Sequence, residues 1–220
     1  MDKEKFKKTV ELICAHKDCD IVLNLTTSGD LHATDETRQA HLRELSPEMA
    51  SYDCGSMNWL NSSLFLNPPA FLEELGATMQ QYNVKPEIEA FDPGMIANAA
   101  YYVKKGVLKA PLHFQFCMGC ANGIPGSVKN LVFMKETMES LCPGSTWSCF
   151  GVGHSAMEIM YAAIAMGGHI RVGMEYNVMF GKGELAKSNV QFVERAKQAI
   201  ELFGRQTATP DEARQILSLK

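Results

Sequence analysis

The fold is decided by residues 167–177, which read Gly167-Gly168-His169-Ile170-Arg171-Val172-Gly173-Met174-Glu175-Tyr176-Asn177. A glycine turn opens this stretch, a short β-strand is predicted to follow over His169–Met174, and charged residues stand where that strand ends. Side chains alternate between the two faces of a strand, so four of them are predicted to share one face: His169, Arg171, Gly173 and Glu175. A parallel β/α barrel carries such residues at its mouth, where chemistry takes place. The alternative is a buried Arg171–Glu175 pair that serves structure alone.

The composition is that of an ordinary globular protein and excludes some partners. The chain has 220 residues, of which 46% are hydrophobic and 21% charged, and its net charge is −4. No basic block and no basic face with interleaved aromatic residues occurs in it. We therefore expect no nucleic-acid partner.

The same sequence carries no feature expected of a membrane or secreted protein. Its longest apolar run, residues 156–167, contains Glu158 and is too short to cross a bilayer, and the charged N-terminus lacks a signal-peptide core. Seven cysteines, an odd number, are typical of reduced thiols in the cytoplasm. Cys117 and Cys120 have the spacing of a metal or redox pair, but no second pair accompanies them at ribbon spacing. We therefore expect a cytoplasmic protein without a membrane partner.

Helix and strand patterns alternate along the whole chain. The strands are predicted over residues 20–25, 49–53, 86–91, 111–117, 146–150 and 169–174. The helices are predicted over residues 2–16, 35–45, 68–81, 94–105, 127–141, 154–166, 185–203 and 210–217. Each strand is thus followed by a loop and a helix, and no linker divides the chain, so residues 1–220 are expected to form a single α/β domain.

The loops after the strands are rich in Gly, Ser, Thr and Asn, which favours a (β/α)8 barrel of the TIM type over an open sheet. No Gly-x-Gly-x-x-Gly fingerprint follows the first strand, as a dinucleotide-binding sheet would require. A closed barrel has eight strands and about 250 residues. Because six βα units are predicted here, the expectation is an N-terminally incomplete barrel that lacks its first two strands.

Short motifs at the strand ends carry a resemblance to a known family. They are Asn24-Leu25-Thr26-Thr27-Ser28-Gly29, Pro47-Glu48-Met49-Ala50-Ser51, Gly55-Ser56-Met57-Asn58, Pro86-Glu87-Ile88-Glu89-Ala90-Phe91-Asp92, Pro111-Leu112-His113-Phe114-Gln115-Phe116, Gly168 to Glu175 and Lys187-Ser188-Asn189. Together they resemble the β-keto acid cleavage enzymes, whose named member is the 3-keto-5-aminohexanoate cleavage enzyme of lysine fermentation. The resemblance covers essentially the whole chain.

The resemblance implies a zinc-dependent, homo-oligomeric (β/α)8 enzyme. Such an enzyme exchanges the acyl part of a β-keto acid with acetyl-CoA, giving acetoacetate and a new acyl-CoA. The resemblance places the metal carboxylate at Glu175, the catalytic arginine at Arg171 and a further active-site carboxylate at Glu89. It also places substrate contacts at five residues: Thr26, Thr27, Ser28, Gly29 and Ser51.

Elementary chemistry makes these implied roles reasonable. A guanidinium can hold a substrate carboxylate or neutralise developing oxyanion charge. The hydroxyls and amides of the Thr26–Gly29 turn suit a carboxylate, although an ordinary turn is the alternative. Glu89 lies nearer the carboxyl end of its strand than Glu87, for which a buried ion pair is expected. His113 is equally compatible with a core histidine whose hydrogen bonds are satisfied.

Two departures from the family pattern bear on mechanism. The family supplies two further zinc ligands as a His-x-His pair, and no such pair occurs among the six histidines of this chain. Since catalytic zinc takes three protein ligands, the chain as it stands is expected to bind zinc weakly or not at all and to show little activity. Tyr176 stands where the family has an aspartate that works with the arginine as a base. Either Glu89 takes over proton abstraction, or the chemistry is altered.

The sequence therefore predicts a metal-dependent acyltransferase acting on a β-keto acid with acetyl-CoA. A metal-dependent carbon–carbon lyase that needs no CoA is one alternative. The other is an inactive barrel fragment, because six strands leave two open sheet edges that favour association.

Overall fold

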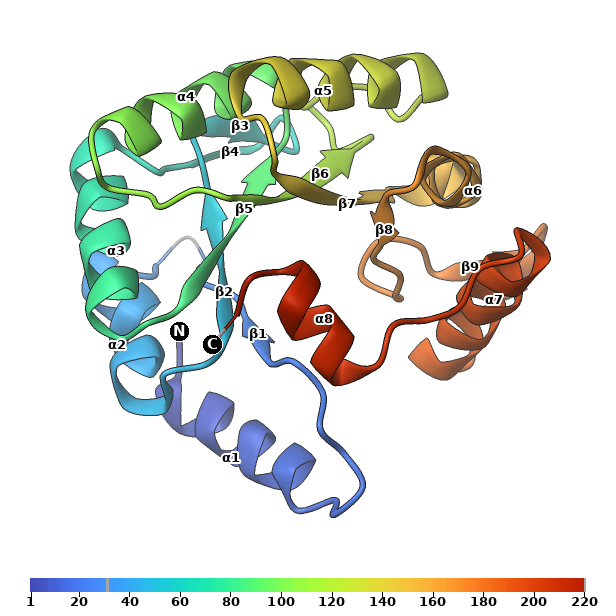
Figure 1. Ribbon diagram of the computed structural model, residues 1–220, viewed down its shortest axis with the longest axis horizontal. Helices are drawn as coiled ribbons and strands as arrows, with labels where there is room; N and C mark the ends of the chain where they lie inside the picture. Colours follow the sequence, from blue (N-terminus) through green and yellow to red (C-terminus); the bar gives the residue numbers. More distant parts are fainter. Residues whose placement is uncertain (31, 220) are drawn as a thin grey trace.

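The computed structural model describes residues 1–30 and 32–219 and contains a curved parallel sheet (Figure 1). Its strands, in spatial order, are β1 (Asn24–Leu25), β2 (Met49–Asp53), β5 (Lys85–Ala90), β6 (His113–Met118), β7 (Thr146–Gly151) and β8 (His169–Ile170). Every neighbouring pair is parallel. The spatial order follows the chain order, so each crossover leads to the adjacent strand. The predicted α/β class is confirmed, as a curled six-stranded parallel sheet.

Helices precede, connect and follow these strands. They are α1 (Lys3–Cys14), α2 (Asp35–Leu45), α3 (Pro69–Gln81), α4 (Pro93–Lys104), α5 (Val128–Leu141), α6 (Ala156–Met166), α7 (Asn189–Leu202) and α8 (Pro210–Ile216), with a 3₁₀ turn at Gly153–Ser155. Helices α3 to α6 lie along the outer, convex side of the sheet (Figure 1). Their positions match the predicted helical segments, apart from boundaries.

The core lies between the sheet and this layer of helices. All residues of β2 and β6 are buried. Phe114 and Phe116 of β6 are fully enclosed, and the Tyr52 hydroxyl of β2 donates a hydrogen bond of 2.7 Å to the Leu72 carbonyl of α3. Polar residues alternate with apolar ones in both strands, and the polar side chains are buried as well, inside the curved sheet.

The predicted strand over His169–Met174 is wrong in its length. Strand β8 ends at Ile170, and the chain then turns, since the Tyr176 and Asn177 amides both donate to the Gly173 carbonyl. The Gly167-Gly168 turn before it is required twice: Gly167 caps α6 with φ +84°, and a Cβ on Gly168 would lie 2.3 Å from the Trp147 ring. The glycine turn is thus as predicted, whereas the four-residue strand face is not.

Other differences concern short elements. Two antiparallel hairpins were not predicted: β3 (Met57–Trp59) with β4 (Ser63–Phe65), and β9 (Met179–Gly181) with β10 (Glu184–Leu185). The first predicted strand begins only at Asn24, and the helix predicted from residue 185 begins at Asn189. These elements depend on pairing between loops, which local periodicity does not report.

Helix α8 lies beside β1 and β2, next to the segments that lead into them (Figure 1). Arg214 of α8 pairs with Asp20 at 2.9 Å and with Glu48 at 2.6 Å, and these acids precede β1 and β2. Within residues 1–30 and 32–219, no helix is long and apolar enough to cross a membrane.

Candidate active site

Strand register brings three acidic side chains together inside the curved sheet. In the β2–β5 pairing, Asp53 lies beside Glu89 and Ser51 beside Glu87. Exposure is 1% for Asp53, 6% for Glu87 and 9% for Glu89. Because Asp53 ends β2 and Glu89 stands one residue from the end of β5, the acids lie at and just below the carboxyl ends of the strands, where a parallel barrel carries its chemistry.

Arg171 is the cation that faces these acids. Its Nη1 lies 2.9 Å from Glu89 Oε1 and 3.5 Å from Glu87 Oε2. The backbone amide of Arg171 donates to the Cys149 carbonyl at 3.0 Å, which extends the β7–β8 pairing by one bond and fixes the start of the side chain. The structure therefore brings Arg171 and Glu89 together, as the sequence predicted, and Glu87 forms the expected buried ion pair.

Aromatic rings hold the guanidinium from the other side. The Arg171 guanidinium lies over the Tyr176 ring at 5.2 Å and the Phe150 ring at 5.8 Å, and these two rings stack at 3.9 Å. Cation–π contacts of this kind add a modest attraction and restrict the orientation of the side chain. Burial raises the pKa of the Tyr176 phenol well above its ordinary value, so this residue stays protonated and is a poor base.

The pKa values of the three acids lie above those of ordinary carboxyl groups, as burial predicts. Burial, reinforced by the Glu89 charge, raises the pKa of Glu87 to about 7. Burial and then the neighbouring Asp53 raise the pKa of Glu89, while burial raises the pKa of Asp53. Burial is the largest single influence on Arg171 and lowers its pKa, but the interactions with Glu89, Tyr176 and Glu87 together outweigh burial, so the guanidinium stays charged. The site therefore combines a permanent cation with acids that can hold protons near neutral pH.

The hydroxyl-rich turn after β1 is fastened to β2 and points toward this cluster. The Thr27 amide donates to Ser51 Oγ at 3.0 Å, and the Thr27 hydroxyl donates to the Ser51 carbonyl at 2.8 Å. Thr26 Oγ1 lies 3.5 Å from Ser51 Oγ, and Ser28 Oγ donates to Asp53 Oδ2 at 2.8 Å. Thus four of the predicted substrate contacts lie together beside the acids.

Close packing explains why Gly29 stands in this turn. A Cβ on Gly29 would lie 2.2 Å from the Ala33 Cβ, which no real contact allows. Arg38 of α2 anchors the turn. Its Nε donates a hydrogen bond of 2.8 Å to the Thr27 carbonyl, and its guanidinium lies 4.0 Å from the centre of the Phe71 ring. The turn is therefore rigid, as a binding element should be.

Glu175 lies apart from the buried acids. Its side chain is 76% exposed, and its nearest cation is Arg171 at 4.0 Å. Because the strand stops at Ile170, the predicted common face of Arg171 and Glu175 is lost. Among the residues that the structure describes, no group of three or more His, Cys, Asp or Glu side chains could hold a metal ion. The side chains around Glu175 therefore do not fit a three-ligand zinc site.

His113 and the Cys117–Cys120 pair are explained by structure. His113 Nδ1 lies 2.8 Å from Thr146 Oγ1, and burial lowers the pKa of this histidine to about 3, so it is a neutral core histidine. The Cys117 thiol points to Glu89 Oε2 at 3.9 Å, and burial raises the pKa of both thiols, that of Cys120 to about 11. Neither cysteine is an activated nucleophile.

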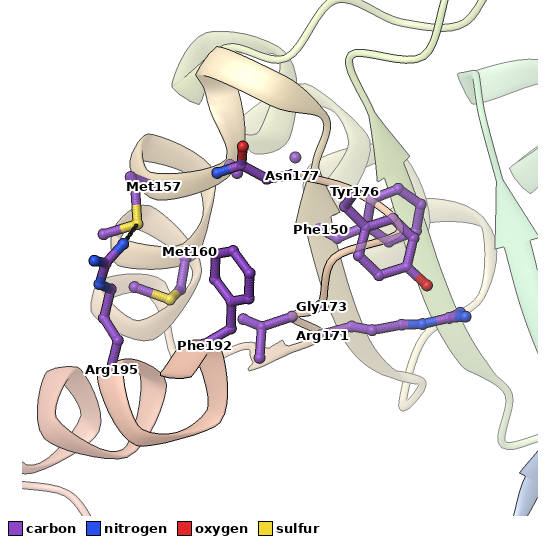
Figure 2. Close-up of a pocket in the computed structure, with 12 residues that line it drawn as sticks. Phe150, Met157, Met160, Arg171, Gly173, Tyr176, Asn177, Phe192 and Arg195 are labelled. Carbon is purple, nitrogen blue, oxygen red and sulfur yellow. Dashed lines mark hydrogen bonds between the residues drawn. The ribbon is translucent and has the colours of Figure 1, made fainter. Parts of the chain in front are cut away.

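A hollow of about 400 Å³, including space open to solvent, lies next to the stem of Arg171 (Figure 2). Its wall is mainly apolar, with Met157 and Met160 of α6 and Phe192 of α7. The Arg171 guanidinium points away from these three residues in Figure 2, toward the acids. The hollow and the acid cluster therefore lie on opposite sides of one side chain.

Two residues of this site escaped the sequence analysis. Asp53 was read only as the end of a strand, although alternation from Ser51 places it on the same face. Arg38 falls in the helix predicted over residues 35–45, for which no functional role was expected, and its 5% exposure follows from contacts with the β3–β4 hairpin and the segment after it, which were not predicted.

A curled parallel α/β sheet with an arginine and buried acids at the carboxyl ends of its strands defines the class of protein: an α/β protein with an enzyme-like strand-end site. The family model described as "beta-keto acid cleavage enzyme" matches residues 1–219. The chain belongs to this family, which confirms the resemblance seen in the sequence.

Named relatives agree with this assignment. A 3-keto-5-aminohexanoate cleavage enzyme of Fusobacterium nucleatum subsp. nucleatum is 45% identical over 219 residues, covering 100% of this chain and 78% of that protein. One of the same name from Acetoanaerobium sticklandii is 38% identical, covering 99% and 78%. A 3-oxoadipate:acetyl-CoA acetyltransferase of Cupriavidus necator is 35% identical, covering 99% and 75%.

The fold is also that of a solved protein. The apo structure of ObcA superposes with a TM-score of 0.80 at 20% identity, over 91% of this chain and 51% of that chain. This chain therefore spans about half the length of ObcA, and the likeness concerns the fold alone.

Proposed function

We propose that this protein exchanges the acyl group of a β-keto acid with acetyl-CoA, releasing acetoacetate and a new acyl-CoA. The observation that carries the proposal is the Arg171–Glu89 contact of 2.9 Å at the strand ends of a chain that belongs to the beta-keto acid cleavage enzyme family. The relatives named for acetyl-CoA-dependent transfers support acetyl-CoA as co-substrate.

Arg171 is proposed to hold the carboxylate of the keto acid. Its guanidinium is charged, restrained by Tyr176 and partly exposed, with 36% of the side chain accessible. Thr26, Thr27, Ser28, Gly29 and Ser51 are proposed to line the same substrate position. Charge-assisted hydrogen bonds to a carboxylate are among the stronger ones available to a protein.

Glu89 is proposed to accept and return the proton that the exchange requires. Tyr176 cannot do so near neutral pH, because burial keeps its phenol protonated. A carboxyl whose pKa is raised by burial toward neutrality is a better general base than an ordinary one. Of the two alternatives raised by Tyr176, we therefore propose proton abstraction by Glu89.

The resemblance implies zinc dependence. We propose it only where side chains other than those described here join Glu175 as ligands. When bound, a divalent ion would act as a Lewis acid on the ketone. The residues described here do not form its ligand set, so no step of the exchange is derived from it. The six strands are proposed to correspond to the last six of a (β/α)8 barrel, with residues 1–220 as one domain.

Two further parts of the proposal rest on smaller observations. In the described part of the chain, strands β1 and β8 each pair on one side only, and open edges of this kind favour association, so we propose a homo-oligomer. Seven cysteines, of which four are buried, suit a reducing compartment such as the cytoplasm.

The test uses the purified chain with acetyl-CoA labelled with ¹³C in both acetyl carbons. Candidate keto acids are 3-keto-5-aminohexanoate, 3-oxoadipate and 3-dehydrocarnitine. The proposal expects a new acyl-CoA by mass spectrometry and both labels in carbons 3 and 4 of acetoacetate, with Arg171→Met as the matched inactive control. Cleavage that continues without acetyl-CoA would instead support the CoA-independent lyase. No turnover from a large assembly would support the inactive fragment.

A further inference from the structure

Asp53 is the buried acid that the proposed function leaves unused. One of its oxygens, Oδ2, accepts a hydrogen bond of 2.8 Å from the Ser28 hydroxyl. The other oxygen, Oδ1, is buried and has no protein donor among residues 1–30 and 32–219. A buried acceptor without a donor is costly, which points to a proton that the heavy atoms do not reveal.

The neighbour of Asp53 supplies the place for that proton. Asp53 and Glu89 are register partners on adjacent parallel strands, and both side chains are buried. A proton shared by the two carboxyl groups would give Asp53 Oδ1 the donor that it otherwise lacks. Like charges on neighbouring strands of a buried site also disfavour double ionisation.

We propose that Asp53 and Glu89 share one proton, and that Asp53 is a positioning residue that acts on the substrate site through Glu89. The role in the substrate site rests on the function proposed above. The shared proton leaves the pair with a single negative charge opposite Arg171. With only one negative charge on Asp53 and Glu89, the Arg171 guanidinium can attract an anionic keto acid. If both carboxyl groups were ionised, their two negative charges would repel it.

Groups on several elements face this pair, and its titration depends on them. They are Ser28 after β1, Arg38 of α2, Cys54 after β2, Glu87 of β5, Cys117 of β6, Cys120 after β6, and Arg171 and Tyr176 after β8. Arg38 and Arg171 are permanently charged, and the cysteines and Tyr176 stay neutral near pH 7 because burial raises their pKa values. Glu87 also titrates near neutral pH, so the experiment must distinguish its titration from that of Asp53 and Glu89.

The test is a ¹³C NMR titration of the full chain, with label in the side-chain carboxyls of Asp and Glu, between pH 4 and pH 10. The wild type is expected to show the Asp53 and Glu89 resonances moving together in two steps more than about one pH unit apart, as interacting sites do. Asp53→Asn is expected to turn the Glu89 titration into one step, at a pH lower by more than about one unit. Glu87→Gln should leave the two-step behaviour in place, and Glu136→Gln, on the exposed face of α5, is the matched control.

A wild-type Glu89 resonance that titrates in one step, unchanged by Asp53→Asn, would overturn the proposal. If Asp53→Asn does not fold, two other measurements test the proposal. One is the number of titration steps in the wild type. The other is the Asp53 resonance in Glu89→Gln, which is expected to titrate in a single step.

Binding of acetoacetate to the wild type at pH 6.5 and at pH 9 is measured in parallel. At least a tenfold weaker binding at the higher pH is expected, and Asp53→Asn should remove most of that difference. A shared proton without any binding of acetoacetate would contradict the proposed function and leave the carboxyl pair established.

Discussion

Replacing Glu87 by glutamine should make the stability of this protein less sensitive to alkaline pH. Glu87 is 6% exposed, and its pKa is raised from 4.5 to about 7 by burial and by the Glu89 charge, against the opposing effect of Arg171. A group whose pKa is raised on folding stabilises the protein below its unfolded value and loses that contribution as the pH rises through its folded value. The contribution of Glu87 to stability is therefore lost as the pH rises from 4.5 to about 7.

The magnitude follows from the size of the shift. A displacement from 4.5 to about 7 corresponds to roughly 3 kcal/mol. About 2 to 3 kcal/mol of this should be lost by the wild type between pH 5 and pH 9, since the unfolded carboxyl is already partly ionised at pH 5. Glu87→Gln keeps the shape of the side chain and cannot ionise, so it should not lose this part.

The assay is urea unfolding of both proteins at pH 5, 6, 7, 8 and 9, followed by circular dichroism. The stability difference, variant minus wild type, is expected to rise by about 2 to 3 kcal/mol across this series. Glu136→Gln should show a difference that is constant with pH to within about 0.5 kcal/mol. If the curves of Glu87→Gln and wild type run parallel, Glu87 does not hold a proton in the folded state and the electrostatic description of the site fails.

Three further outcomes are expected. Arg171→Lys should lower kcat/KM for the keto acid by about 100-fold or more, because lysine cannot reproduce the planar, two-pronged contact; an unchanged value in steady-state assays would remove Arg171 from the substrate site. Gly29→Ala should lower stability by about 1–3 kcal/mol in thermal unfolding, since the added Cβ would lie 2.2 Å from Ala33, and a neutral effect would show that the turn is soft. Metal analysis of the purified chain should find well under one zinc per chain, and one tightly bound zinc would contradict the structure around Glu175.

Local sequence determined the order of helices and strands. Pro69 and Pro93 at helix starts, the Thr34 capping box and the glycine that ends α6 are signals that act within a few residues, and the structure uses each of them. The β2 and β5 strands were readable for the same reason. Side-chain alternation along β5 also separated Glu87 from Glu89 in depth before any tertiary information was available.

Tertiary structure decided which charges meet. The length of β8, and with it the position of Glu175, depends on how far the chain can pair with β7 before the turn at Gly173. The pairing of Asp53 with Glu89 requires two strands, far apart in the chain, to align in one register. Alternation fixes the face of each side chain, whereas its neighbour across the sheet and its burial arise only from packing. The candidate residues were therefore visible in the sequence, and their protonation was a property of the fold.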